Sequence, residues 1–294
     1  MPEMAGRSSG KPGTGDPSSV GEGISSPTDD DIGTDEPIAS GPDACLLEVL
    51  DLCKVFKARG MPDKVALDGV SFYIQEGECL GLVGESGSGK STTARIIARL
   101  DDATSGKVLL HGEDITDTHG RDLRHVYSSI QMVFQNPAGS FDPRRTLGDG
   151  VSESLRNAGM PRDEAMARSI ELMGRCGLGP EFAGRYPWEA SGGQCQRAAI
   201  ARALAIGPSL LILDEATSAL DVTVQQQVVE LLRGIEDETG MSMLFISHDI
   251  ALVSGFCNRM AVLESGKVVE EGRTQAVMDS PQSPYTQKLI DSIL

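Results

Sequence analysis

Residues 84–92, Gly-Glu-Ser-Gly-Ser-Gly-Lys-Ser-Thr, have the spacing G-x-x-x-x-G-K-[ST] of a phosphate-binding loop. Glycines let such a loop wrap around a triphosphate with its N–H groups pointing inward, so no net positive charge is needed. We expect Lys90 to reach the β- and γ-phosphates and Ser91 to bind Mg²⁺. The loop residues predicted to bind nucleotide are Gly84, Glu85, Ser86, Gly87, Ser88, Gly89, Lys90, Ser91 and Thr92.

Polar side chains also follow three apolar runs further along the chain. Asp214 and Glu215 come after Ser-Leu-Leu-Ile-Leu, and we expect Asp214 to hold Mg²⁺ through water and Glu215 to polarise the attacking water. His248 follows Leu-Phe-Ile-Ser, where ligands bind at the ends of parallel strands, and is predicted to contact the γ-phosphate. Gln135 ends Ile-Gln-Met-Val-Phe-Gln and is either a ligand of Mg²⁺ or water, or a polar strand cap.

A second glycine-rich helix start, Ala-Ser-Gly-Gly-Gln, occupies 190–194. Ser191 alone would be explained as an N-cap, but glycine lowers helix stability, so two consecutive glycines need another reason. Cys195 follows directly and has no partner at metal-ligand spacing. We expect a structural cysteine there; the alternative is a reactive thiol whose pKa the helix N-terminus lowers.

The elements that must position these residues alternate between strand and helix, which predicts an α/β fold with a parallel sheet. A helical block at about 148–207, with helix starts near Leu147, Arg162 and Ser191, interrupts the alternation. Ser265-Gly266 is the predicted turn of a hairpin. Strands are expected at 46–56, 65–74, 78–84, 106–115, 129–135, 209–215 and 242–249, and helices at 91–100, 222–239, about 250–256 and 283–294.

Composition limits the partners. The chain of 294 residues has 26 basic and 43 acidic side chains, a net charge of −17, so we expect no nucleic-acid partner. Its six cysteines form no C-x-x-C pair, which argues against a zinc site or a disulfide framework. The most apolar run, 203–213, is short of the roughly 20 residues that span a bilayer, and the N-terminus has no apolar signal region. We therefore expect a soluble protein.

Residues 1–44 are rich in Gly, Pro, Ser and Asp, with nine acidic and two basic side chains. Such a segment has almost nothing to bury, so the sequence predicts a disordered acidic tail. The folded domain is expected to begin at about residue 45.

Together the motifs resemble the nucleotide-binding subunit of ABC transporters, over nearly all of 46–294. That resemblance implies a P-loop cassette: a RecA-like core with an N-terminal antiparallel β region, an inserted helical subdomain at about 136–207 and a C-terminal extension at about 274–294. The matching motifs are Walker A at 84–92, the Q-loop at Gln135, the signature at 190–194, Walker B ending in Asp214 and Glu215, the D-loop at 218–221 and the switch His248.

In this family two cassettes pair head to tail, as homo- or heterodimers, around ATP and Mg²⁺. The resemblance implies that Mg²⁺ is held by Ser91, Gln135 and Asp214, and that Glu215, His248 and Lys90 are catalytic. Asp221 would lie at the dimer seam, and Phe56 would stack on adenine or, alternatively, pack in the core. The signature residues that would cap the ATP of the partner are Ser191, Gly192, Gly193 and Gln194.

Three segments resemble the peptide and nickel importers of this family: the stretch after Gln135, 185–197 and the C-terminal 280–294. Ala190, Trp188, Cys195 and Ala216 depart from the commoner residues of that branch. The implied protein is an ATP-hydrolysing importer subunit on the inner face of the cell membrane, with a permease and an extracytoplasmic binding protein as partners. The alternatives are a non-transport ABC ATPase, such as a carbon–phosphorus lyase component, and a regulatory module that does not hydrolyse ATP.

Overall fold

A computed structural model describes residues 45–57, 60, 62–217 and 220–292. The predicted tail, 1–44, lies outside the described residues, as do Ser218 and Ala219 of the D-loop motif. Everything below refers to the described part of the chain.

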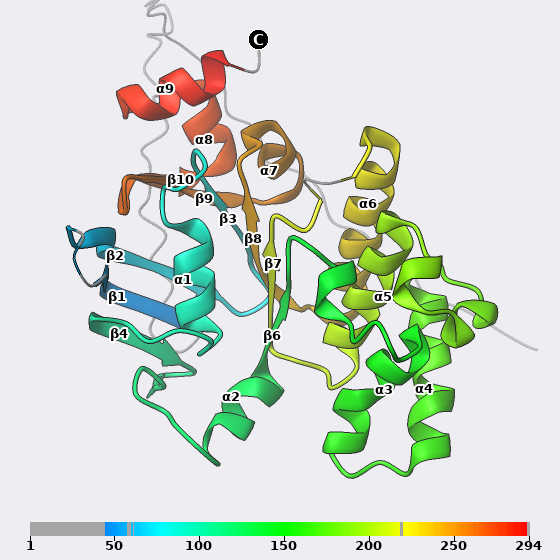
Figure 1. The fold of residues 1–294 in the computed structure, drawn as a ribbon. Helices are drawn as coiled ribbons and strands as arrows, with labels where there is room; N and C mark the ends of the chain where they lie inside the picture. The colour runs from blue at the N-terminus through cyan, green and yellow to red at the C-terminus, as the bar shows by residue number, and fades with distance from the viewer. Residues whose placement is uncertain (1–44, 58–59, 61, 218–219, 293–294) are drawn as a thin grey trace, which may run out of the picture. The chain divides into compact units, whose positions relative to one another are not determined.

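Two sheets form the framework (Figure 1). The first is antiparallel and consists, in spatial order, of β2 (Lys64–Gln75), β1 (Cys45–Phe56), β4 (Ser105–Leu110) and β5 (Glu113–Asp114). The second has the order β10 (Lys267–Arg273), β9 (Arg259–Glu264), β3 (Cys79–Val83), β8 (Ser242–Ser247), β7 (Leu210–Asp214) and β6 (Ile130–Val133). All neighbours in the second sheet run parallel except β9 and β10, so the predicted parallel α/β sheet is confirmed.

Side chains of the parallel strands alternate between two cores, as the period-two geometry of a strand requires. The core shared with the antiparallel sheet and α1 (Lys90–Ile97) receives Leu80, Leu82, Leu210, Ile212, Leu244 and Ile246. The opposite core, which helices cover, receives Cys79, Val83, Leu211, Leu213, Met243 and Phe245. Because both faces of β3, β7 and β8 are buried, their sequences are mostly apolar, and the polar residues Ser242, Ser247 and Asp214 stand at strand ends.

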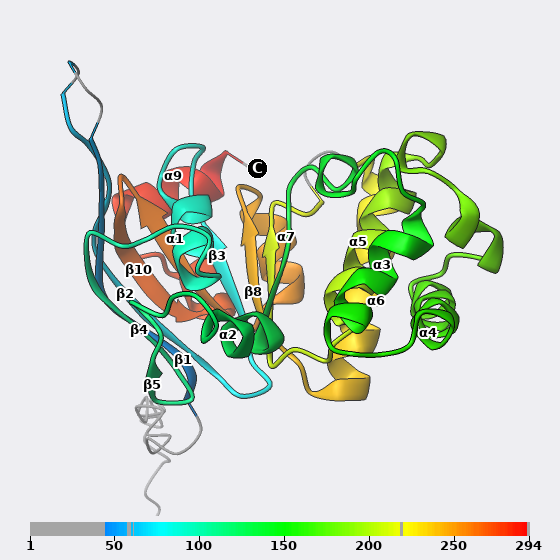
Figure 2. The ribbon, with the colours of Figure 1, turned by 60° about the horizontal axis from the view of Figure 1, so that its bottom comes forward.

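The helices on the second core fall into two groups. One is α3 (Leu147–Asn157), α4 (Arg162–Arg175) and α5 (Gly192–Leu204), which pack on each other and stand beside the sheet (Figures 1 and 2). The other is α6 (Val222–Thr239), α7 (Ile250–Phe256), α8 (Thr274–Asp279) and α9 (Pro284–Asp291). The short 3₁₀ turns of the first group are η2 (Ala138–Ser140), η3 (Pro180–Gly184) and η4 (Pro187–Glu189).

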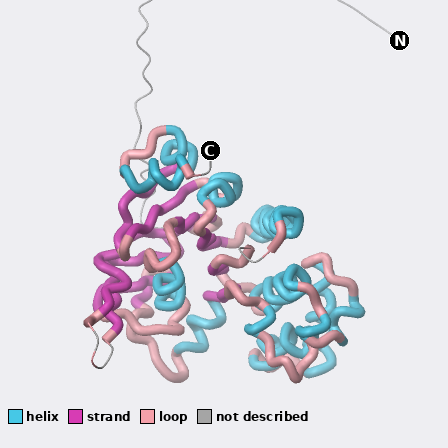
Figure 3. Tube along the Cα trace, turned by 45° about the horizontal axis from the view of Figure 1, so that its top comes forward, coloured by secondary structure: helices cyan, strands magenta, loops and turns pink. Residues whose placement is uncertain are grey.

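Some elements differ from the prediction. The strand expected at 106–115 is two strands, because His111 and Gly112 both adopt positive φ (48° and 77°) and make a tight turn. The hairpin turn at Ser265-Gly266 is confirmed, with φ of 49° and 83°. Two short helices, α2 (Leu123–Ser129) and α8, were not predicted, since neither is long enough to show a clear helical period. Figure 3 shows the resulting distribution of helix and strand.

Four of the parallel strands, β3, β8, β7 and β6, end in register. Backbone pairing places Val83 beside Ser247, Ile246 beside Asp214 and Leu213 beside Val133. The residues that follow these strand ends therefore meet at one edge of the sheet, where open parallel sheets bind ligands.

Candidate functional site

The glycine-rich loop connects β3 to α1 at this edge, and its glycines are required by geometry. Gly84 has φ 155° and Gly89 has φ 114°. A Cβ at Gly84 would lie 2.2 Å from the carbonyl oxygen of Leu263, and one at Gly89 would lie 2.7 Å from that of Ala66. Neither position has room for a side chain, so the loop packs its back against the protein while Glu85, Ser86 and Gly87 are exposed.

Lys90 is turned into its own loop. Its side-chain ammonium donates to the carbonyl oxygen of Gly84 at 2.7 Å and to that of Glu85 at 2.9 Å. Burial lowers the pKa of Lys90, and the charges of Glu215 and Asp214 oppose that shift. The two carboxylates favour the charged form of Lys90, and that positive charge attracts the phosphates of a nucleotide.

Ser91 and Asp214 meet behind the loop. The Ser91 hydroxyl donates to Oδ1 of Asp214 at 2.9 Å, which joins the start of α1 to the end of β7. Burial raises the pKa of Asp214, the Ser91 hydrogen bond lowers it, and the charge of Glu215 raises it further. A hydroxyl and a carboxylate are hard oxygen ligands of the kind that Mg²⁺ prefers.

Glu215, Gln135 and His248 converge beside this pair. The amide of Gln135 donates to Oε2 of Glu215 at 2.7 Å, and Nδ1 of His248 lies 3.7 Å from the same oxygen. Glu215 has a positive φ of 46°, and its N–H donates to the carbonyl oxygen of Ile246 at 3.0 Å, which holds this unusual backbone in place. The strand before Gln135 ends at Val133, two residues earlier than predicted, and the extra length lets Gln135 reach Glu215.

The site fits a nucleotide triphosphate with Mg²⁺. The Ser88 hydroxyl is buried in the glycine-rich loop and has no hydrogen-bond partner among the described residues. Gly87 has φ 83° and open space where a Cβ would stand, so the outer side of the loop is clear. An exposed glycine-rich loop with a buried, unpartnered hydroxyl and a lysine beside it matches what a phosphate chain needs.

The signature segment is a capped helix start. Ser191 is the N-cap of α5: its hydroxyl accepts from the Gln194 N–H at 3.3 Å, and Gln194 Oε1 accepts from the Ser191 N–H at 2.9 Å. Gly193 has a packing reason of its own, because a Cβ there would lie 2.5 Å from Val224 Cγ1 on α6. A Cβ at Gly192 would touch only Leu220, at 3.9 Å, so packing within the chain does not require that glycine.

The structure does not join the signature to the glycine-rich loop of the same chain. Among the described residues no hydrogen bond or ion pair connects 191–194 with 84–92. Figures 1 and 2 both draw α5 well apart from α1. The predicted role of the signature residues Ser191, Gly192, Gly193 and Gln194 on the nucleotide of a partner stays a prediction.

Two predicted residues have local partners instead. Phe56 ends β1 and is 41% exposed, with the ammonium of Lys54 4.9 Å from its ring centre, so it is not a core residue. Asp221 is the N-cap of α6, and its Oδ1 accepts from the Val224 N–H at 3.0 Å. The adenine and dimer-seam roles of Phe56 and Asp221 stay predictions.

The reactive alternative for Cys195 is wrong. Its side chain is fully buried, and its thiol donates to the carbonyl oxygen of Pro187 at 3.3 Å. Burial raises the pKa of Cys195, which is the opposite of the shift expected at a helix N-terminus. Two other buried free cysteines, Cys79 and Cys257, are 178 positions apart in the sequence, and their sulfur atoms lie 3.2 Å apart.

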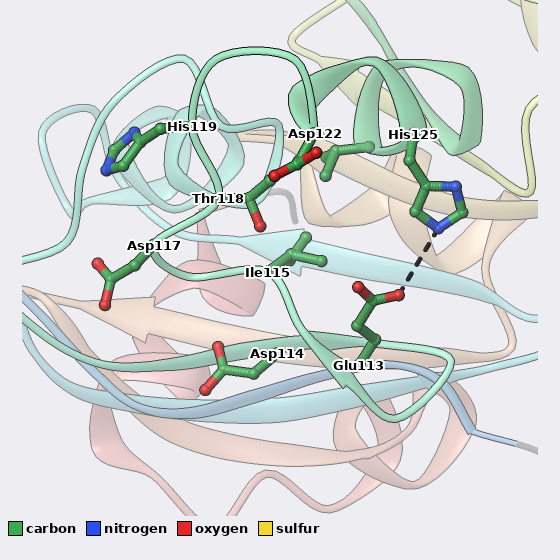
Figure 4. A pocket seen from close by; sticks show the side chains of 9 residues that line it. Glu113, Asp114, Ile115, Asp117, Thr118, His119, Asp122 and His125 are labelled. Carbon is green, nitrogen blue, oxygen red and sulfur yellow. Dashed lines mark ion pairs between the residues drawn. The ribbon is translucent and has the colours of Figure 1, made fainter.

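A cavity of about 630 Å³ lies elsewhere, between β5 and α2 (Figure 4). In it His125 Nε2 lies 3.8 Å from Glu113 Oε2. The cavity contains none of the predicted nucleotide residues, and its four carboxylates would repel a triphosphate. Its lining is Glu113, Asp114, Ile115, Asp117, Thr118, His119, Asp122, His125 and Val126.

Comparison with known proteins places this site in a family. Residues 67–218 match the ABC transporter family profile. The chain is 47% identical over 229 residues to the glutathione import ATP-binding protein GsiA of Escherichia coli O157:H7, covering 78% of this chain and 37% of that protein. GsiA of Shigella dysenteriae serotype 1 is 45% identical over 255 residues, covering 84% and 41%. The chain thus spans about two fifths of the curated relatives it matches, and it belongs to the ABC transporter family.

Solved structures give the same fold. The dimeric ATP-binding cassette MJ0796, in a post-hydrolysis state bound to ADP and Pi, superposes with a TM-score of 0.72 at 32% identity, over 78% of this chain and 99% of that one. CbiO1 of Clostridium perfringens, part of the ABC transporter complex cbiONQ, gives 0.71 at 28% identity, over 81% and 92%. The predicted P-loop ABC cassette is confirmed. Within the described residues no helix is both long and apolar enough to cross a bilayer.

Proposed function

We propose that this chain is the ATP-hydrolysing subunit of an ABC importer for peptide-like substrates, converting ATP and water to ADP and phosphate. One observation carries the proposal. The Glu215 carboxylate is held by Gln135 and faces His248 at the sheet edge where Lys90 and the Ser91–Asp214 pair also lie. This set contains a base, a nucleotide-binding cation and oxygen ligands for a metal, which are the parts that phosphoryl transfer to water needs.

Each side chain has a distinct task in this hydrolysis. Glu215 accepts a proton from the attacking water, and Gln135 keeps its carboxylate oriented by the 2.7 Å hydrogen bond. Lys90 and His248 stabilise the negative charge that builds on the transferring phosphoryl group. Mg²⁺, held by Ser91 and Asp214 with Gln135 nearby, would supply charge neutralisation on the phosphate oxygens.

Hydrolysis also needs a second cassette in this proposal. The donors of Ser191 and Gly193 stand at the N-terminus of α5, whose positive end favours an anion, yet they are remote from their own loop. Pairing head to tail, as a homo- or heterodimer, would bring them to the γ-phosphate of the partner. The dimeric state named for MJ0796 supports this arrangement.

The loop after Gln135 would couple nucleotide binding and hydrolysis to movement of a permease. Arg202 of α5 donates to the Ser140 carbonyl oxygen at 2.6 Å and to its hydroxyl at 2.9 Å, and it stacks 4.4 Å from the Phe141 ring centre. The loop is thereby fixed to the signature helix. Beyond it lie Arg144, exposed and beside Asp142 at 3.4 Å, and Arg145, half-exposed and paired with Glu153 at 3.1 Å, which would contact a cytoplasmic helix of the permease.

The relatives support a substrate class and a location for this proposal. The GsiA proteins are named for glutathione import, which supports a short peptide-like cargo. Delivery by an extracytoplasmic binding protein is part of the proposal, and nickel is its alternative cargo. The chain would then be a cytoplasmic subunit on the inner face of the cell membrane. Residues 45–294 form the cassette, with 136–207 as helical subdomain, 274–294 as C-terminal extension and 1–44 as an acidic tail.

The test is phosphate release by the purified chain with ATP and Mg²⁺, followed by the same assay in liposomes that contain candidate permease subunits. We expect hydrolysis in the first assay and stimulation by a peptide and its binding protein in the second. Absence of hydrolysis in both assays would overturn the ATPase assignment. Hydrolysis that no permease or peptide changes would overturn the importer assignment alone.

A further inference from the structure

The peptide unit that joins Gly84 to Glu85 is held at both of its polar ends. On one side the Gly84 carbonyl oxygen accepts from the Lys90 ammonium at 2.7 Å. On the other side the Glu85 N–H donates to the hydroxyl of Tyr285 at 2.8 Å. Tyr285 is 200 positions away in sequence, on the C-terminal helix α9. One rigid peptide plane therefore connects that helix to the lysine of the nucleotide loop.

Tyr285 is itself fixed by the structure around α9. Ser283 caps the helix by accepting from the Tyr285 N–H at 3.2 Å. The carboxylate of Glu270 on β10 accepts from the N–H groups of Gln282 and Ser283 at 2.8 and 3.0 Å. The apolar side of α9 packs on the helix-covered core through Tyr285, Leu289 and Ile290. These contacts fix the position from which the Tyr285 hydroxyl contacts the glycine-rich loop.

We propose that Tyr285 is a positioning residue for the nucleotide loop. By fixing the Gly84–Glu85 peptide it sets the direction of the Gly84 carbonyl, and with it the place of Lys90, before nucleotide arrives. This inference rests on the proposed ATPase function. The second link between α9 and the loop, Lys288 to the Glu85 carboxylate at 3.2 Å, joins two exposed side chains and contributes little.

Removal of the Tyr285 hydroxyl should weaken nucleotide binding while leaving the fold intact. Tyr285→Phe keeps the ring in the core and deletes one hydrogen bond, so we expect the Kd for ATP with Mg²⁺ to rise by about two- to tenfold, the range of one hydrogen bond. The kcat should fall by a similar factor, because Lys90, whose place this peptide sets, also stabilises the charge on the transferring phosphoryl group. Lys288→Ala should leave the Kd unchanged within about twofold.

The experiment measures equilibrium ATP binding, steady-state hydrolysis and amide hydrogen exchange of the 84–90 segment in the full chain. Tyr127→Phe is the matched control. Tyr127 lies on α2, and its hydroxyl donates to the carbonyl oxygen of Arg99 at 3.4 Å rather than to the glycine-rich loop. Faster exchange and a raised Kd in Tyr285→Phe alone support the inference. An unchanged Kd and unchanged exchange overturn it. If the wild-type chain binds no ATP, the proposed function fails, and the inference with it.

Discussion

Gln135 donates its side-chain amide to the Glu215 carboxylate across 2.7 Å, although 80 residues separate them in the chain. The contact joins the loop after β6 to the residue after β7, so it depends on the parallel register of those strands. One oxygen of Glu215 thus faces both Gln135 and the imidazole of His248. These contacts fix the orientation of the Glu215 carboxylate.

Deleting the Gln135 amide should misplace that carboxylate. For Gln135→Ala we expect kcat to fall by about ten- to a hundredfold, because small displacements of a reacting group have effects of this size. ATP binding measured without Mg²⁺ should stay near the wild-type value. Gln131→Ala on the preceding strand is the control, since Gln131 donates to the Tyr127 and Ile130 carbonyl oxygens instead. A kcat near that of wild type in Gln135→Ala would contradict the positioning role.

Asp214 should make the stability of the nucleotide-free protein depend on pH. Burial raises the pKa of Asp214 in the folded state above its unfolded value, although the Ser91 hydrogen bond opposes this. Between the unfolded pKa and the folded pKa of Asp214, the folded state binds more protons than the unfolded state. The free energy of unfolding is therefore higher at low pH, and the contribution of Asp214 is lost as the pH rises through its folded pKa.

Asp214→Asn removes the ionised form. We expect the variant to have a higher free energy of unfolding than wild type at about pH 7.5, with the difference narrowing as pH falls through the folded pKa of Asp214. Urea titrations without nucleotide over a pH series measure it. A difference of the same size at every pH, or a less stable variant at neutral pH, would speak against a strained carboxylate.

Gly193 should be required for stability as well as for the signature. The Cβ of Gly193→Ala would lie 2.5 Å from Val224 Cγ1, so we expect a loss of about 1–3 kcal/mol in the free energy of unfolding, typical of overpacking. Gly192→Ala is the matched control, because its Cβ would make an ordinary contact with Leu220. Alanine also has a higher helix propensity than glycine, so the free energy of unfolding should stay at or above that of wild type.

A double-mutant cycle separates the two roles of Gly193. Val224→Ala should relieve the loss caused by Gly193→Ala, and the coupling appears as non-additive unfolding free energies. Gly193→Asp should leave ATP binding largely intact while preventing closure of the cassette pair and hydrolysis. Because it also strains the α5–α6 packing, its rate of hydrolysis is compared with that of wild type at an equal fraction of folded protein. Strict additivity would show that the α5–α6 contact does not explain the glycine.

Cys195 should be inert in the folded protein. Its pKa is raised by burial, and burial also raises the pKa of Cys176 to about 12. In native protein at about pH 8 we expect alkylation of the partly exposed Cys53 first, with Cys195 modified only after unfolding. Mass spectrometry of the digested protein measures the order. Labelling of Cys195 as fast as Cys53 would restore the reactive alternative.

Much of the nucleotide site could be predicted because its parts are local patterns. Glu215 and His248 each follow an apolar strand, and parallel strands bring such ends to one edge. The glycine-rich loop is likewise contained in nine consecutive residues. The positive φ of Glu215 leaves no trace in residue type, since an ordinary side chain adopts it under tertiary constraint.

Contacts between distant segments could not be predicted. No pattern in the sequence pairs Tyr285 with Glu85, Arg202 with Ser140, or Gly193 with Val224, because each contact depends on how whole elements pack. The burial of Cys195 has the same origin: the helix start alone indicated a lowered pKa, and the turn at Pro187 covers the thiol.

The central claim is that Glu215 is the base for ATP hydrolysis, and Glu215→Gln tests it most directly. The substitution keeps the size of the side chain and removes its ability to accept the proton. We predict ATP binding within about threefold of wild type and phosphate release slower by about a hundredfold or more, the usual contribution of a general base. Phosphate release at close to the wild-type rate, with binding intact, would contradict the account.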